Sequence, residues 1–218
     1  MTLRFGVMIG LLAGTLGLLG AGCVSVPRAP LGQGHDFGRN NPRLCLAMGD
    51  SITQNEGGKS SYPALLSRML RKTVVNRGDG GSHSLDGMRN VNRFLTLHKP
   101  GYLLILYGAN DVLHDRSCDA YIENLRFMIR AARQNKTIPI LATMTPMTKG
   151  HKGHASTVSR YNVKVRELAK SEGVPLCDLE LHFMAAGATW GALLQADGLH
   201  PDEQGMRLIA QSFYDLMR

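Results

Sequence analysis

The sequence predicts an α/β domain in which a parallel β-sheet is covered by helices on both faces. Strand-length apolar runs alternate with amphipathic stretches of helical spacing, and this alternation is typical of parallel strands joined by right-handed crossovers. Two of the runs, residues 103–106 and 138–142, are apolar without interruption, as expected for strands buried on both faces. Several runs are followed directly by glycine, serine or asparagine, and ligands bind at this edge of such sheets.

Each expected strand is short, and helical stretches lie between the strands. The strands are expected at residues 44–48, 73–75, 102–107, 138–143 and 174–177. The helices are expected at residues 62–70, 85–97, 121–133 and 158–171, with a closing helix at residues 202–216. A chain of 218 residues is long enough for one domain of ordinary size. We therefore expect a single domain after the N-terminal segment.

The N-terminal segment, residues 1–23, has the pattern of an export signal. Arg4 precedes an uncharged apolar run over residues 5–21, and the run is followed by Gly22 and Cys23. This ending resembles a bacterial lipoprotein signal, which implies lipidation of Cys23 and a membrane-anchored protein of the bacterial cell envelope, facing the periplasm or the exterior. An uncleaved membrane-spanning anchor and an ordinary secretory signal are the alternatives. All three would export the domain.

The next segment, residues 24–42, is rich in proline and glycine and shows little apolar periodicity, which predicts a flexible tether. The folded domain is expected to occupy residues 43–218. Three cysteines follow Cys23, so at most one disulfide can form within this domain. The sequence leaves open whether Cys118 and Cys177 pair. No C-x-x-C pair or cysteine–histidine cluster indicates a zinc site.

The formal net charge of +8 raises the question of nucleic-acid binding. However, the basic residues are spread along the chain, and the longest cluster lies within residues 68–77. Aromatic residues make up only 6% and do not interleave with the basic positions as a base-stacking surface requires. A solvated basic surface is therefore favoured, and no nucleic-acid partner is expected. Attraction to an anionic envelope surface is compatible with this charge.

The first chemically distinctive segment is Gly49-Asp50-Ser51, which follows the first expected strand directly. A serine at a helix start is often only an N-cap. A serine hydroxyl becomes a nucleophile when a positioned base removes its proton, and donors must then hold the oxyanion that forms on an attacked carbonyl. The function of Ser51 therefore depends on whether a base and such donors lie nearby.

A base and its partner are present near the C-terminus, in Asp197-Gly198-Leu199-His200-Pro201. A carboxylate three residues before a histidine, in a turn that contains glycine, can reach back to the imidazole. Asp197 would then fix the tautomer of His200 and leave the other ring nitrogen to face Ser51.

Donors for an oxyanion are available after the second and third expected strands. The second strand is followed by residues 76–81, which contain three glycines whose backbone N–H groups could approach a ligand closely. The third strand is followed by Gly108-Ala109-Asn110-Asp111, which places a side-chain amide at the same sheet edge. Backbone N–H groups and an asparagine amide are the usual parts of an oxyanion hole.

Together these four segments, in this order, resemble the SGNH hydrolases, also called the GDSL esterase/lipase family. The resemblance covers about residues 43–218 and implies a flavodoxin-like three-layer α/β/α sandwich with a parallel sheet of about five strands. It also implies that Ser51 is the nucleophile, His200 the base and Asp197 its orienting partner. The oxyanion hole would be formed by the backbone N–H groups of Ser51 and Gly81 with the amide of Asn110, and Gly78 and Gly80 are the neighbouring alternatives to Gly81. No metal or other cofactor is implied.

The expected activity is hydrolysis of carboxylic esters through an acyl-enzyme. Ile52-Thr53 after the serine is a variant seen in members of the family that deacetylate carbohydrates, so a short acyl group such as O-acetyl on a glycan is expected first. No long apolar insertion between the segments would build a lid for lipid. The alternatives are a lysophospholipase or thioesterase for longer acyl chains, and a catalytically idle glycan-binding lipoprotein. The sequence does not determine the oligomeric state.

Several other residues near these segments have two interpretations each. His151 and His154 have H-x-x-H spacing, but the glycines around them favour a basic loop beside the site over a metal-binding helix. His83 and His114 could line the pocket or lie in solvated loops. The only tryptophan could contact a sugar or pack in the core. This tryptophan is Trp190. Asp50 and Asp111 are expected to have only structural roles, as caps or hydrogen-bond partners.

Overall fold

The computed structural model describes residues 30–55 and 60–218. The predicted export signal, its lipidation residue Cys23 and the first part of the predicted tether lie outside the described residues. Within the described part of the chain, no helix is both long and apolar enough to cross a membrane.

Strands and helices alternate along the described chain as the sequence predicts. The strands are β1 (Asn41–Gly49), β2 (Thr73–Gly78), β3 (Pro100–Leu106), β4 (Ile138–Ala142) and β5 (Leu176–Cys177). The α-helices are α1 (Ser51–Gln54), α2 (Tyr62–Leu70), α3 (Ser84–His98), α4 (Ala109–Leu113), α5 (Cys118–Gln134), α6 (Ala155–Glu172), α7 (Leu179–Ala185) and α8 (Glu203–Met217). Two 3₁₀ helices, η2 (Lys149–His154) and η3 (Gly187–Leu193), lie in the loops after β4 and α7.

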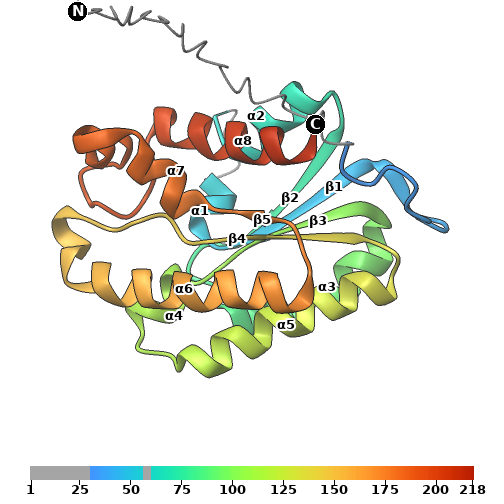
Figure 1. The fold of residues 1–218 in the computed structure, drawn as a ribbon, viewed down its shortest axis with the longest axis horizontal. Helices are drawn as coiled ribbons and strands as arrows, with labels where there is room; N and C mark the ends of the chain where they lie inside the picture. Colours follow the sequence, from blue (N-terminus) through green and yellow to red (C-terminus); the bar gives the residue numbers. More distant parts are fainter. Residues whose placement is uncertain (1–29, 56–59) are drawn as a thin grey trace, which may run out of the picture.

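The sheet has five parallel strands in the order β2-β1-β3-β4-β5. Helices α2 and α8 pack against each other on one face, and α3, α5 and α6 cover the other, which gives three layers (Figure 1). The predicted α/β/α sandwich is therefore confirmed. Since all strands point the same way, the loops that follow them meet at one edge of the sheet, beside α1 and α7 (Figure 1).

The core explains why the apolar runs form the central strands. Every residue of β3 is buried, and β1 is buried from Cys45 onward, so both strands lose contact with water on both faces. On one face, Tyr62 of α2 stacks on Phe213 of α8 with ring centroids 5.5 Å apart, and neither ring is exposed. Burying one such ring stabilises the fold by roughly 1.5–3 kcal/mol. This contact holds α2 and α8 together.

From Pro30 onward, the chain differs from the flexible tether that we predicted for residues 24–42. Leu31 and Phe37 pack against the core, and the Tyr102 hydroxyl donates to the Leu31 carbonyl at 2.9 Å. Strand β1 begins at Asn41, which pairs with Pro100. The prediction is wrong for this part because the contacts are long-range, and local composition does not reveal them.

All three described cysteines are free, so Cys118 and Cys177 form no disulfide. Cys45 and Cys177 are buried in β1 and β5. Burial raises the pKa of the Cys45 thiol to about 12, so this group stays protonated and behaves as a small apolar residue.

Candidate active site

Ser51 lies at the carboxyl end of β1, as the first residue of α1. Asp50 caps this short helix, and its carboxylate accepts a hydrogen bond from the Ile52 N–H at 3.0 Å. Gly49 makes the tight approach possible, because a Cβ at this position would lie 2.0 Å from Thr53 Oγ1. The strand end, the glycine and the cap together fix the direction in which Ser51 points.

His200 and Asp197 lie in the loop before α8, and the fold brings them to Ser51. The Ser51 hydroxyl lies 2.9 Å from His200 Nε2, and His200 Nδ1 lies 2.6 Å from Asp197 Oδ2. Asp197 Oδ1 also accepts the backbone N–H groups of Leu199 and His200, at 3.0 and 3.1 Å. Asp197 is therefore held on both oxygens, and His200 has one nitrogen for Asp197 and one for Ser51.

The protonation of this group follows from its contacts. Partial burial by itself would raise the pKa of Asp197, but the hydrogen bonds from the His200 side chain and from the backbone outweigh it and lower the pKa below its usual value. The carboxylate is then ionised near neutral pH and accepts a hydrogen bond from the Nδ1–H group of His200. With Nδ1 donating, Nε2 is the acceptor that faces the Ser51 hydroxyl.

The turn between Asp197 and His200 depends on Gly198. Its φ is +73°, and a Cβ would lie 2.0 Å from the Thr148 carbonyl oxygen. The backbone of Thr148 in turn donates to the Gly198 carbonyl at 2.9 Å. Only glycine fits both the backbone angle and this close approach.

Asn110 lies in α4, just after β3, and is largely buried at 9% exposed. One N–H of its amide donates to the Ser82 carbonyl at 2.9 Å, which fixes the amide and leaves its second hydrogen for a ligand. Ser82 belongs to the loop after β2, so this hydrogen bond joins the two loops that carry the predicted oxyanion donors.

The three glycines after β2 have different surroundings. A Cβ at Gly78 would lie 2.1 Å from the Gln54 backbone nitrogen, and a Cβ at Gly80 would lie 2.7 Å from Gln54 Oε1 and 4.0 Å from Ser51 Cβ. Gly78 and Gly80 therefore pack against α1. Gly81 has a φ of +78° and open space around its Cα. This leaves its backbone accessible, and its oxyanion role stays a prediction.

Asp50 and Asp111 have structural contacts, in agreement with the sequence. Asp111 accepts the Ser84 N–H at 3.0 Å and the Ser84 hydroxyl at 2.6 Å, which fixes the start of α3. Asp50 is 1% exposed. Burial, with a smaller contribution from the Asp111 charge, raises the pKa of Asp50 to about 7 against the Ile52 hydrogen bond.

The segment around His151 forms the 3₁₀ helix η2, whereas the glycines led us to expect no helix there. His151 Nδ1 donates to the Asp197 carbonyl at 2.8 Å, and Lys149 Nζ donates to the carbonyls of Leu194 and Gln195 at 3.1 and 3.0 Å. The predicted location beside the site is confirmed. The support that η2 gives to the Asp197 loop was missed, because nothing in the local sequence signals it.

The remaining candidates lie near the site without joining it. His83 Nε2 lies 3.2 Å from His114 Nδ1, and His83 lines a cavity of about 480 Å³ together with Asp111. Trp190, in η3, is partly buried and packs against the core. Among the described residues, no group of three or more histidine, cysteine or acidic side chains could hold a metal ion.

A serine, a histidine and an aspartate hydrogen-bonded in series at this edge of a parallel sheet are the arrangement of a serine hydrolase. The model of the GDSL-like lipase/acylhydrolase family matches residues 47–208, about three quarters of the chain. The chain belongs to this family and is a carboxylic ester hydrolase, so the resemblance inferred from the four segments is confirmed.

Two proteins with related sequences have been described. The uncharacterized lipoprotein YqeF of Bacillus subtilis is 29% identical over 175 residues, which cover 65% of this chain and 72% of YqeF. The esterase TesA of Pseudomonas aeruginosa is 28% identical over 164 residues, which cover 72% of this chain and 78% of TesA.

Solved structures share the fold at lower identity. The acetylxylan esterase Axe2 of Geobacillus stearothermophilus superposes with a TM-score of 0.71 at 22% identity, covering 82% of this chain and 95% of Axe2. The acetyl xylan esterase AlAXEase gives a TM-score of 0.73 at 20% identity, covering 80% of this chain and 100% of that structure. At this identity the likeness concerns the fold.

Proposed function

We propose that the chain is a serine esterase that removes short acyl groups, O-acetyl on carbohydrate in particular, from a lipoprotein position in the cell envelope. The observation that carries the proposal is the series of hydrogen bonds from Ser51 through His200 to Asp197, at 2.9 and 2.6 Å. Without this series, Ser51 would be an ordinary residue at a helix start.

In the proposed mechanism, Nε2 of His200 takes the Ser51 proton as the serine oxygen attacks the ester carbonyl carbon. The negative charge that develops on the carbonyl oxygen is held by the N–H groups of Ser51 and Gly81 and by the free hydrogen of the Asn110 amide. His200 then gives its proton to the departing alcohol oxygen, which leaves the acyl group on Ser51. A water molecule, deprotonated by His200, attacks this ester and releases the acid.

Two observations favour a short acyl group on a carbohydrate. The site is open to solvent, since the side chains of His200 and Asp197 are 33% and 37% exposed, and this suits an acetyl group projecting from a bulky polymer. The solved structures with this fold include two named as acetylxylan esterases. The lipoprotein position is supported by the predicted signal ending at Cys23 and by the related lipoprotein YqeF.

The proposal is tested with p-nitrophenyl acetate and longer nitrophenyl esters, using wild type, Ser51→Ala and Ser67→Ala. Ser67 is a matched control, because it too is a partly buried helical serine. Its hydroxyl donates to the Lys72 carbonyl and has no histidine partner among the described residues. Turnover should vanish with Ser51 and persist with Ser67. A rate that falls beyond butyrate supports the short acyl group, and a maximum near octanoate supports a lysophospholipase or thioesterase. No turnover and no labelling of Ser51 by a fluorophosphonate would indicate an idle glycan-binding protein.

A further inference from the structure

The edge of the sheet opposite the active site carries a band of basic side chains. The strand pairing Leu44 to Thr73 and Asn41 to Pro100 brings the residues just before β1, β2 and β3 to this edge, and β4 starts there too. Helices α2, α3 and α5 end at the same edge, because they run back antiparallel to the strands. We call this set the basic edge, and it consists of Arg39, Arg43, Arg71, Lys72, Lys99 and Lys136.

Acidic side chains at this edge leave much of the positive charge uncompensated. Asp36 pairs with Lys136 at 2.5 Å. The other two acids at helix ends, Glu172 and Asp215, are paired with arginines of their own. Among the described residues, the exposed side chains of Arg39, Arg71 and Lys99 have no hydrogen-bond or ion-pair partner. The basic edge is therefore available to an anionic partner.

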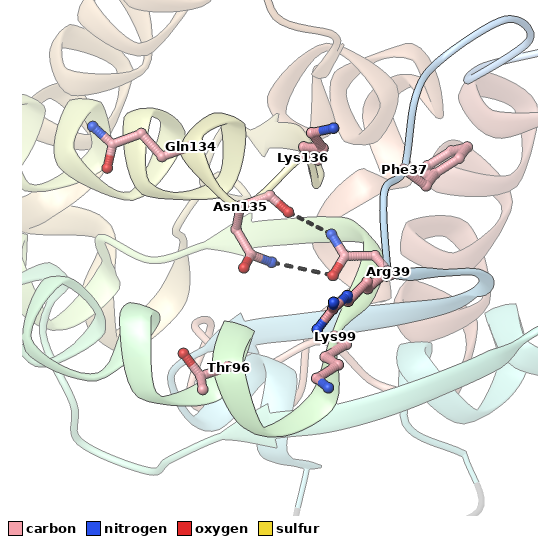
Figure 2. Close-up of a pocket in the computed structure, with 8 residues that line it drawn as sticks. Phe37, Arg39, Thr96, Lys99, Gln134, Asn135 and Lys136 are labelled. Carbon is pink, nitrogen blue, oxygen red and sulfur yellow. Dashed lines mark hydrogen bonds between the residues drawn. The ribbon is translucent and has the colours of Figure 1, made fainter.

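Part of the basic edge is hollowed. A cavity of about 340 Å³ lies between the segment before β1 and the ends of α3 and α5 (Figure 2). Arg39 and Lys99 both line it (Figure 2), and so do Asn40 and Asn135, whose side chains are hydrogen-bonded to each other at 3.5 Å. The exposed side chains of Arg39 and Lys99 can donate charge-assisted hydrogen bonds to a phosphate group in this open depression.

The chain enters the domain at the same edge. Residues 30–40 lie beside the starts of the central strands, at the end of the sheet away from α1 and α7 (Figure 1). The His35 ring donates to the Lys136 carbonyl at 3.1 Å, which fixes this segment next to the basic edge. Cys23 precedes Pro30 by seven residues, and seven residues span at most ~25 Å. A lipid on Cys23 would therefore keep the basic edge close to the bilayer.

We propose that the basic edge docks on the anionic lipid headgroups of the membrane that holds the anchor, and that docking directs the active site away from this membrane. The inference rests on the proposed lipidation of Cys23. Strand β1 runs from this edge to Ser51 and has nine residues, so about 30 Å separates the nucleophile from the docked surface. The docked enzyme then acts on polymers that extend from the envelope, and ester bonds of lipids in its own bilayer are out of its reach.

The test uses the full chain, reconstituted in vesicles of phosphatidylcholine alone or with roughly one third phosphatidylglycerol. Lysines are acetylated with a water-soluble reagent and quantified by mass spectrometry. Lys99 and Lys136 report on the basic edge, and Lys152 in η2, which is exposed beside the active site, is the internal control. Docking predicts that the anionic vesicles protect Lys99 and Lys136 but leave Lys152 unchanged. About 1 M salt should remove this protection, since the screening length is then ~3 Å.

Two matched double variants separate docking from general charge effects. Arg39→Gln with Arg71→Gln removes two cations from the basic edge, and each should lower the docking equilibrium constant about fivefold, or about 25-fold together. Arg89→Gln with Arg116→Gln removes two exposed cations near the active-site edge and should leave protection intact. Equal labelling of Lys99 in both kinds of vesicle, or equal loss of protection in both variants, would overturn the docking proposal.

The outcomes for the anchor, the orientation and the activity are distinguishable. Flotation of the chain with neutral vesicles, abolished by Cys23→Ala, tests the anchor alone. Protection of Lys99 tests docking, whatever flotation shows. Hydrolysis of p-nitrophenyl acetate by the same vesicles tests the esterase, and it should be equal in the Arg39/Arg71 variant and wild type because neither arginine lies at the site.

Discussion

Replacement of Asp50 by asparagine should change how the stability of the domain depends on pH. Asp50 is 1% exposed and directly precedes Ser51, and burial raises its pKa from 3.8 to about 7. Asparagine has nearly the same shape, keeps an oxygen to accept the Ile52 N–H and cannot ionise. The variant therefore removes the titration and retains the helix cap.

The sign and size of the effect follow from the two pKa values. Between about pH 4 and about pH 7, Asp50 is ionised in the unfolded chain and protonated in the folded one, so the free energy of unfolding of wild type falls as pH rises. Above about pH 7 both states are ionised and the dependence ends. A shift from 3.8 to about 7 corresponds to about 4 kcal/mol. Relative to wild type, the free energy of unfolding of Asp50→Asn should therefore increase by about 4 kcal/mol between about pH 4 and about pH 8.

Urea unfolding of the chain from Val24, followed by circular dichroism over this pH range, measures the difference. Asp36→Asn is the control, since Asp36 is exposed and its pKa is lowered by the hydrogen bond from Lys136. The free energy of unfolding of Asp36→Asn should not increase relative to that of wild type as pH rises. If the Asp50→Asn difference is the same at all pH values, Asp50 is ionised in the fold throughout, and the reasoning from burial is wrong.

Three further substitutions test the site. Asp197→Asn puts an amide beside His200 Nδ1 and favours the wrong tautomer, so kcat should fall by about 10⁴ with unchanged circular dichroism; a fall below tenfold contradicts the proposed role. Asn110→Ala should lower kcat by ~10²–10³ with little change in KM, and unchanged turnover excludes Asn110 as an oxyanion donor. Gly198→Ala should lower the free energy of unfolding in urea by more than ~3 kcal/mol, because the new Cβ is strained at φ +73° and also lies 2.0 Å from a carbonyl oxygen. Gly187→Ala is its control: φ there is +79° with nothing within 4 Å, and it should lose only ~1–3 kcal/mol.

The secondary structure could be predicted wherever local patterns dominate. The helix at residues 62–70 was predicted with its observed bounds, because an amphipathic stretch begins at a proline in its first turn and ends before basic residues. Strand β5 has only two residues rather than the predicted four, because only Leu176 and Cys177 pair with β4. Strand β1 starts earlier than predicted, at Asn41, because Asn41 pairs with Pro100 of β3.

The sequence by itself determined the α/β class, the family and the Asp197–His200 pair, whose partners are three residues apart in one glycine turn. Only the tertiary structure decided the contact between Ser51 and His200, because 149 residues separate them and the strand order brings them together. It also decided the hydrogen bonds from Lys149 and His151 to the loop that carries Asp197 and His200, and the gathering of the basic residues at one edge. The physical reason is that periodicity and turn chemistry act over a few residues, whereas the position of a loop at a sheet edge depends on the packing of the whole core.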